Sequence, residues 1–255
     1  MTEAVLVETR GPALWIRLNR PERRNAYDPE MAEAIISAIE GAGSARAVVI
    51  TGSGGSFCAG GSLQSLSVPT TSGMRELYRT SLRLFDTIRQ CPRPVIAAVS
   101  GPAAGGGNEL VVACDLAVAG RSATFGQTGP RVGSAPVTGA TNVMAVQIGE
   151  KGAKELAMLC RRHSAEDALR LGLVNAVVDD DAVESVVQQW TEEIAQLSPR
   201  YLEITKVSSN FWWDTARASF TNGIGMLVQA VGSADMVEGA TAFLEKRRPN
   251  FPDPE

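Results

Sequence analysis

Short apolar runs alternate with amphipathic segments through the first half of the chain. Runs rich in Val, Ile and Leu, which predict strands, occupy residues 4–9, 13–18, 46–52, 94–101 and 116–120. Apolar residues at helical spacing predict helices over 28–40 and 73–90, and a further helix from about Gly106. Buried strands separated by helices are typical of an α/β fold in which most strands pair in parallel.

The second half of the chain is more helical. Helical spacing recurs near 139–147, 151–159 and 164–171, stops at a short strand over 173–178, and resumes over 182–196, 199–210, 214–231 and 234–246. The segment at 164–171 opens with Ser-Ala-Glu-Asp, which resembles a capping box with Asp in place of Glu. We therefore expect an α/β body over residues 1–195, followed by a helical region over 196–255.

Composition and charge exclude several classes of protein. Lys and Arg number 24 and Asp and Glu 28, so the net charge of −4 offers no broad surface for nucleic acid or anionic membranes. No apolar run reaches the roughly 20 residues of a membrane span, and the N-terminal segment lacks the pattern of a secretory signal. We expect a cytoplasmic protein with neither a nucleic-acid nor a membrane partner.

The cysteines and the single histidine bear on the kind of site. Cys58, Cys91, Cys114 and Cys160 stand far apart without a Cys-x-x-Cys pair, which favours free thiols over a zinc site. His163 would have to serve any Ser-His-Asp or Cys-His mechanism. Because it follows two arginines and precedes a predicted helix cap, we expect a surface histidine. No metal site is predicted.

Two glycine-rich loops each follow a short apolar strand, in the segments GSGGSFCAGG and GPAAGGGNEL. Neither fits a phosphate-binding pattern, because the first lacks the lysine of a P-loop and the second lacks the G-x-G-x-x-G spacing. Glycine lets a backbone N–H approach a ligand closely, and two such groups on one oxygen would stabilise an oxyanion. The second loop also opens a helix, whose dipole adds positive potential. Ordinary turns remain the alternative interpretation.

Six segments in order resemble the crotonase family, the enoyl-CoA hydratase/isomerase superfamily. They are FCAGGSL (57–63), RPVIAAVSG (93–101), AAGGGNELVVACDLAVA (103–119), FGQTGPRVG (125–133), ALRLGLVNAVV (168–178) and EGATAFLEKRRPNF (238–251). The resemblance implies a spiral of ββα units and a C-terminal helical region that forms trimers or dimers of trimers. It also implies an acyl-CoA thioester as the ligand and no cofactor.

The same resemblance assigns roles to individual residues. The amides of Gly61 and Gly106 would form the oxyanion hole. Arg24 matches a CoA contact, and Lys246 matches a lysine near the CoA of a neighbouring subunit. The remaining positions expected to line the acyl-CoA site are Ala59, Ser62, Leu63, Gly105, Thr128, Gly129 and Ser134. Ser62 stands where an acidic residue is common in the family.

Hydratases of this family use two glutamates, and only one is present here. Glu109 matches the first, three residues after Gly106, where it could hold a water or move a proton. The second would fall at Gly129, in the segment Phe-Gly-Gln-Thr-Gly. Losing one proton-transfer partner typically costs about 10²–10⁴-fold in rate. Ordinary hydration of a 2-enoyl-CoA is nevertheless the first expectation.

Segment FGQTGPRVGS is more similar to two ring-chemistry members, 1,4-dihydroxy-2-naphthoyl-CoA synthase and 2-ketocyclohexanecarboxyl-CoA hydrolase. In some naphthoyl synthases the glycine at the Gly129 position admits bicarbonate, in a site lined at the Thr128 and Ser134 positions. The likeness fails at Pro136, where those enzymes carry aspartate, and at Glu109, where they carry valine. Cleavage or closure of a carbon–carbon bond on a β-keto acyl-CoA is therefore the alternative, and a catalytically weak binding or assembly role is a third.

Aromatic residues could also contribute to an acyl pocket. Tyr78 and the pair Trp212-Trp213 lie in segments predicted to be helical. Aromatic residues at such positions more often belong to a core or an interface, so their contact with substrate is the less favoured interpretation.

Overall fold

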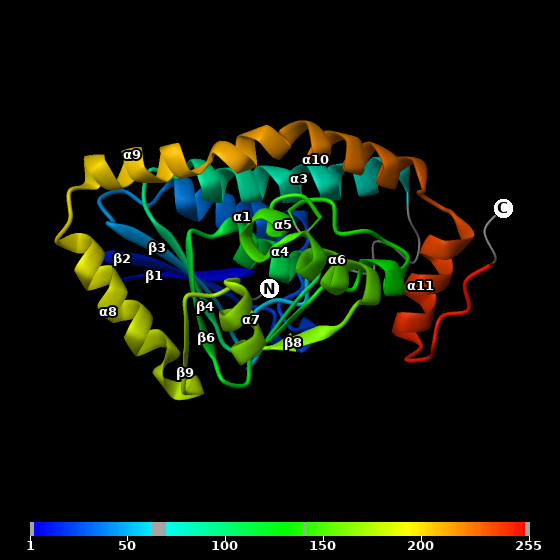
Figure 1. Cartoon of the computed structure of the whole chain (residues 1–255), viewed down its shortest axis with the longest axis horizontal. Helices are drawn as coiled ribbons and strands as arrows, with labels where there is room; N and C mark the ends of the chain where they lie inside the picture. Colours follow the sequence, from blue (N-terminus) through cyan, green and yellow to red (C-terminus); the bar gives the residue numbers. More distant parts are fainter. Residues whose placement is uncertain (1–2, 63–69, 140, 253–255) are drawn as a thin grey trace.

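A computed structural model describes residues 3–62, 70–139 and 141–252. Its main sheet has six strands in the order β1-β2-β3-β4-β6-β9 (Figure 1). Their bounds are β1 (Val5–Arg10), β2 (Ala13–Leu18), β3 (Ala47–Gly52), β4 (Val95–Val99), β6 (Leu116–Gly120) and β9 (Ala176–Val178). Strands β1 and β2 form an antiparallel hairpin, and the other neighbours pair in parallel. The predicted mixed α/β architecture is confirmed.

Helices cover both faces of this sheet. The helices of the first half are α1 (Pro29–Glu40), α3 (Thr71–Gln90) and α4 (Gly106–Ala113). They pack on one face, where Ile16, Val48 and Ala97 belong to a large apolar core. Trp15, Val49 and Ile96 point to the opposite face and meet helix α8 (Val183–Ala195). Successive residues of a strand alternate between faces, so one apolar run supplies both layers.

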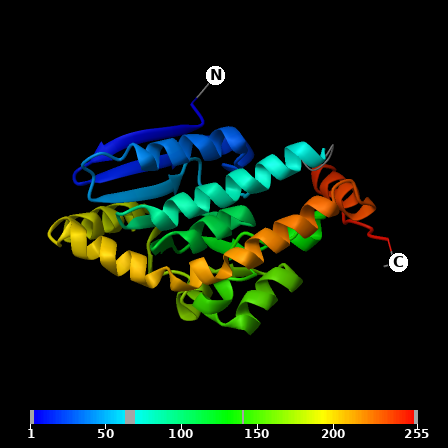
Figure 2. The same ribbon diagram turned by 90° about the horizontal axis from the view of Figure 1, so that it is seen from above.

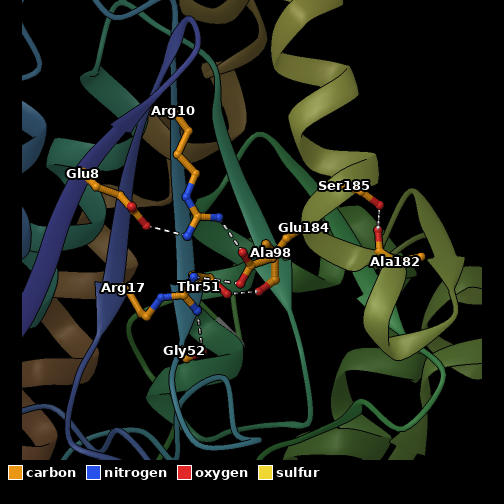
Figure 3. Close-up of polar contacts among 9 residues, drawn as sticks. All are labelled: Glu8, Arg10, Arg17, Thr51, Gly52, Ala98, Ala182, Glu184 and Ser185. Atoms are coloured by element: carbon orange, nitrogen blue, oxygen red, sulfur yellow. Dashed lines mark hydrogen bonds and ion pairs between the residues drawn. The ribbon is translucent and has the colours of Figure 1, made fainter.

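Helix α8 is joined to the hairpin by charge as well as by packing. Glu184 in its first turn accepts from Arg10 Nη1 at 2.5 Å and from Arg17 Nη2 at 2.8 Å (Figure 3). Arg10 also binds Glu8 on its own strand (Figure 3). An acidic residue at a helix N-terminus is attracted to the positive end of the helix dipole. Here two guanidinium groups also fix the position of the carboxylate.

A second, smaller sheet has the order β5-β7-β8 and was absent from the sequence prediction. Its strands are β5 (Pro102–Ala104), β7 (Thr124–Gly126) and β8 (Arg162–Ser164). Strands of three residues are too short to show the alternation from which strands are predicted. His163 lies in β8 opposite Phe125, half-buried, with its Nε2 atom shielded from solvent. His163 is therefore only partly exposed, in contrast to the expected surface histidine.

Several helices begin at a side-chain cap. Asp28 caps α1, Thr70 caps α3, and Ser164 with Asp167 forms the predicted capping box of α7 (Ala165–Leu171). The neighbouring helices are α5 (Met144–Ile148) and α6 (Glu150–Leu159). Helix α5 starts five residues later than predicted, because Gly139 has a φ of 149°, which a helix cannot contain. Single-turn 3₁₀ helices occupy η1 (Pro21–Arg23), η2 (Gly129–Val132) and η3 (Asp180–Ala182).

Three further helices complete the described chain, α9 (Pro199–Ser209), α10 (Phe211–Gln229) and α11 (Ala234–Leu244). Figures 1 and 2 show α9 and α10 end to end, with α10 running along α3. Helix α11 packs on the start of α3 and on η2, where Met236 and Ala240 meet Met74 and Leu77. Helix α10 begins three residues earlier than predicted, after a break at Asn210.

A buried charge cluster fastens α9 to the sheet. Lys206 Nζ lies 2.7 Å from Asp115 Oδ2 and donates to the carbonyl oxygens of Ile88 and Arg93 at 2.8 and 2.9 Å. Asp115 also accepts from the Val95 amide at 2.7 Å, and Arg89 Nη1 lies 3.8 Å from its other oxygen. Burial raises the pKa of Asp115 despite these cations.

Three negative observations concern the described residues alone. None of their helices combines the length and apolar character needed to cross a membrane. Within the same ranges, no three His, Cys, Asp or Glu side chains gather as metal ligands would. All four cysteines are buried and unbridged.

Candidate acyl-binding site

A pocket with a cavity volume of about 100 Å³ opens where α4 begins. Helix α3, the loop after β3 and the segment from Gln127 to Thr138 form its walls. Nine of the predicted site residues line it: Ala59, Gly61, Ser62, Gly105, Gly106, Glu109, Thr128, Gly129 and Ser134. Segments far apart in the sequence thus converge on one cavity.

The loop after β3 is fixed by the segment that precedes α1. Tyr27 N donates to Gly60 O at 2.9 Å, and Ser62 N donates to Tyr27 O at 2.9 Å. Ala59 N donates to Arg24 O at 2.9 Å. Gly61 lies between these bonds, and its own N–H donates none of the backbone hydrogen bonds found among the described residues. Gly61 itself lines the pocket.

The second glycine loop lies against the first. Gly105 N binds Gly126 O at 2.9 Å, and the backbone of Gly105 (φ 53°, ψ −124°) leads directly into α4. The Gly106 amide is the first of the helix, so it has no acceptor within the helix. A Cβ on Gly60 would lie 2.8 Å from the Gly106 nitrogen, so the two loops touch and only glycine permits the contact.

Glu109 presents its carboxylate to the same pocket from the first turn of α4. The residue is 5% exposed. Thr138 donates a hydrogen bond to each carboxylate oxygen, from its backbone N to Oε1 at 2.9 Å and from its Oγ1 to Oε2 at 2.8 Å. Thr138 was not predicted, because nothing in the sequence links a threonine 29 positions away to this glutamate. It orients the carboxylate towards the cavity.

The wall opposite Glu109 carries amide and hydroxyl groups. Glu109 is the one carboxylate among the described residues that line the pocket. Gln127 is fully buried, and neither its Oε1 nor its Nε2 has a hydrogen-bond partner among the described residues. A Cβ on Gly129 would meet Ala135 Cα and Ser134 O at 3.0 Å, so a side chain there would run into the following backbone.

Two tyrosines line the pocket as well. The Tyr27 hydroxyl donates to Ser81 Oγ at 3.3 Å, and the Tyr78 hydroxyl lies 3.4 Å from Ser134 Oγ. Burial raises the pKa of both phenols, and the charge of Glu109 adds to the effect. Tyr78 was a candidate from the sequence, but Tyr27 was not, since its position before α1 gave no sign of proximity to Gly106.

The remaining predicted residues do not line this cavity. Arg24 is exposed next to the loop at Ala59, and Lys246 is exposed beyond the end of α11. Leu63 lies outside the described residues. Trp213 is buried and donates to Asp86 Oδ1 at 2.8 Å, whereas Trp212 is 53% exposed. Trp213 is thus a core residue, as the favoured interpretation has it, and an interface role for Trp212 stays a prediction.

Comparison with known proteins identifies the fold. The family model described as enoyl-CoA hydratase/isomerase matches residues 8–254. The chain is 32% identical to a carnitinyl-CoA hydratase from Mycobacterium avium, with a TM-score of 0.86 and coverage of 98% of this chain and 99% of that one. It is 30% identical to an enoyl-CoA hydratase from Mycobacterium avium subsp. paratuberculosis K-10, with a TM-score of 0.85 and coverage of 98% and 99%.

A third structure, DspI of Pseudomonas aeruginosa, is 30% identical, with a TM-score of 0.79 and coverage of 87% of this chain and 90% of that chain. The predicted crotonase fold with a helical C-terminal region is confirmed. Because these matches span nearly the whole chain, the protein belongs to the enoyl-CoA hydratase/isomerase family, whose members process acyl-CoA thioesters.

Proposed function

We propose that the protein hydrates a 2-enoyl-CoA. The observation that carries this proposal is that the Glu109 carboxylate held by Thr138 and the loop glycines Gly61 and Gly106 line one pocket. In this proposal Gly61 and Gly106 form the oxyanion hole for the thioester oxygen, and Glu109 acts on a water beside the acyl chain. The hydratases among the structural relatives support the same reaction class.

Each proton can be followed through the reaction. Glu109 takes a proton from water while the water oxygen bonds to Cβ, and the electron pair of the Cα–Cβ double bond moves towards the thioester oxygen. The two amides stabilise the resulting enolate, in which the oxygen carries more charge than in the substrate. Protonated Glu109 then returns the proton to Cα, so one carboxylate acts first as base and then as acid.

The rest of the ligand and the assembly complete the proposal. Arg24 flanks the loop at Ala59, a suitable place to contact the phosphates of CoA, and Lys246 would reach the CoA of a neighbouring subunit. Exposed apolar side chains on α9 and α10 support a trimer or a dimer of trimers: Tyr201, Ile204, Val207, Phe211 and Trp212. Four buried thiols favour a reducing, cytoplasmic location.

Carbon–carbon bond cleavage on a cyclic β-keto acyl-CoA is the second candidate. It is favoured by the pocket lining, where Gly129 stands in the place of the second acid, next to Thr128 and near Ser134. A bicarbonate ion could supply the missing carboxylate. It would have to occupy the open cavity, because the backbone of 134–135 fills the space next to Gly129.

Product analysis in ¹⁸O-labelled water distinguishes the candidates. The purified protein receives crotonyl-CoA and, separately, a 2-ketocycloalkane-carboxyl-CoA. Hydration places the label on C3 of a hydroxyacyl-CoA, whereas ring opening places it in a new free carboxylate. Added bicarbonate at fixed pH and ionic strength should raise the rate only if the ion takes part.

Variants of two glutamates test the assignment of Glu109. Glu109→Gln should lower the hydration rate by roughly 10²–10⁴-fold while CoA thioester still binds. Glu166→Gln makes the same change at an exposed ion pair with Arg121 and should leave the rate unchanged. Equal activity of Glu109→Gln and wild type would refute the mechanism. Binding without either reaction would favour the third expectation, a binding or assembly role.

A further inference from the structure

The pocket contains two phenols that the proposed reaction does not use, and that of Tyr27 lies against Gly106. Tyr27 is 3% exposed, and its ring lies against the first residue of α4. A Cβ on Gly106 would lie 2.5 Å from the Tyr27 hydroxyl oxygen and 3.1 Å from Cε1 and Cζ of its ring. The hydroxyl therefore sits directly over the Gly106 Cα, at the entrance to the helix.

The backbone of the same residue holds the other donor loop. Tyr27 pairs with Gly61 in an isolated parallel bridge, through its bonds to Gly60 O and Ser62 N. Tyr27 thus adjoins both loop glycines, since its main chain pairs with Gly61 and its phenol packs on the Cα side of Gly106. A ligand oxygen placed between Gly61 and Gly106 would lie beside the phenol.

The present hydrogen bond of the hydroxyl is a weak one. The distance to Ser81 Oγ is 3.3 Å, longer than the 2.5–3.0 Å usual between two oxygens. The Ser81 hydroxyl donates its own proton to Leu77 O at 2.8 Å, and this bond does not depend on Tyr27. Exchanging Ser81 for a ligand oxygen that carries developing charge would give the phenol a stronger acceptor.

The surroundings of the Tyr27 phenol favour its protonated form, which is a hydrogen-bond donor. Burial, with the charge of Glu109 as the second cause, raises the pKa of Tyr27 far above neutrality. The group therefore keeps its proton near neutral pH and can donate a hydrogen bond to a ligand.

We propose that the Tyr27 hydroxyl is a third hydrogen-bond donor to the acyl oxygen held by the Gly61 and Gly106 amides. The proposal rests on the proposed acyl-CoA function. The donor stabilises the enolate more than the substrate, because the oxygen gains charge as the reaction proceeds. It also selects ligands that place an oxygen, rather than a methylene group, beside Tyr27.

Infrared spectroscopy of a bound thioester tests this directly. The probe is butyryl-CoA labelled with ¹³C at the carbonyl, which cannot be hydrated. We expect the carbonyl stretch to move to higher frequency in Tyr27→Phe than in wild type, since one hydrogen bond is lost. In the hydration assay kcat should fall by roughly 10²-fold, the lower end of the cost of losing one oxyanion donor, with little change in KM.

The chain has three tyrosines, which gives a matched series of the same chemical change. Tyr78→Phe removes a pocket hydroxyl that lies near Ser134, and Tyr201→Phe removes an exposed one on α9. Neither should shift the carbonyl stretch. A shift of equal size in Tyr78→Phe would assign the effect to general pocket polarity and overturn the proposal.

Ser81→Ala distinguishes donation to the ligand from a structural role. If the phenol serves only to bind Ser81, this variant should reproduce Tyr27→Phe. If the phenol donates to the ligand, the carbonyl stretch of Ser81→Ala should stay at or below the wild-type frequency. An unshifted stretch in Tyr27→Phe overturns the proposal. If butyryl-CoA binds but no hydration occurs, the reaction alone fails; if wild type binds no acyl thioester, both proposals fail.

Discussion

The two ends of α4 differ in whether the polar groups around them have hydrogen-bond or charge partners. At the N-terminal end, the Gly106 amide has no acceptor within the helix, and the fully buried Gln127 side chain has no hydrogen-bond partner among the described residues. Beyond the C-terminal end, Asp115 is surrounded by Lys206, Arg89 and the Val95 amide. A buried polar group without a hydrogen-bond partner costs free energy, so an unpaired group that lines a pocket is a candidate contact for a ligand.

This contrast separates groups that stabilise the fold from groups that meet a ligand. The cluster at Asp115 joins α9 to the sheet, although Arg89 Nε is an exception with no partner among the described residues. Polar groups at the pocket end of α4 have fewer hydrogen-bond partners, and a bound ligand or water would supply the missing hydrogen bonds. Three changes test how far this separation holds, beginning with the largest expected effect.

Lys206→Met should destabilise the protein by about 3–5 kcal/mol, because it leaves the Asp115 carboxylate buried with only Arg89 as a nearby cation. Chemical denaturation of the purified variant measures this. Adding Asp115→Asn should recover part of the loss, since Asn can still accept from Val95 and carries no charge. A double variant as unstable as the sum of both single ones would show that the pair does not act as a unit.

Gln127→Met should have the opposite consequences for stability and activity. Removing a buried amide without partners should raise the free energy of unfolding by about 1 kcal/mol, while the hydration rate falls. Thermal denaturation and the labelled-water assay report the two effects separately. Loss of stability with unchanged activity would place Gln127 with the structural groups of the cluster.

The smallest expected effect is the pH dependence of folding stability, which has opposite signs for two carboxylates. Burial raises the pKa of Asp115, so its contribution to stability is present below its ordinary value of 3.8 and is lost as pH rises through the folded value. The hydrogen bonds from Arg247 and Asn250 N lower the pKa of Glu238 to about 2, so its contribution is present above 4.5 and lost as pH falls.

Denaturation at a series of pH values compares each wild-type stability with that of Asp115→Asn or Glu238→Gln. The wild-type advantage over Asp115→Asn should shrink as pH rises from 3, and the advantage over Glu238→Gln should grow. If both differences changed in the same direction, the buried and exposed carboxylates would not differ as described.

Parts of the site were predictable because they are local. Gly61, Gly106 and Glu109 lie in short motifs whose glycines and helix start can be recognised in the sequence. Thr138 and Tyr27 could not be found in this way, because each depends on a contact between distant segments. The short strands β5, β7 and β8 were missed for the same reason, since three residues become a strand only when a partner lies alongside.

The sequence by itself determined the α/β class, the positions of most helices and strands of the main sheet, and the two glycine loops. Hydrophobic spacing and glycine content are local properties, so they can be interpreted one segment at a time. The tertiary structure alone decided that Tyr27 touches both loops, that Thr138 orients Glu109 and that Gln127 is buried without a partner. These features depend on which surfaces pack together, and packing is set by the whole fold.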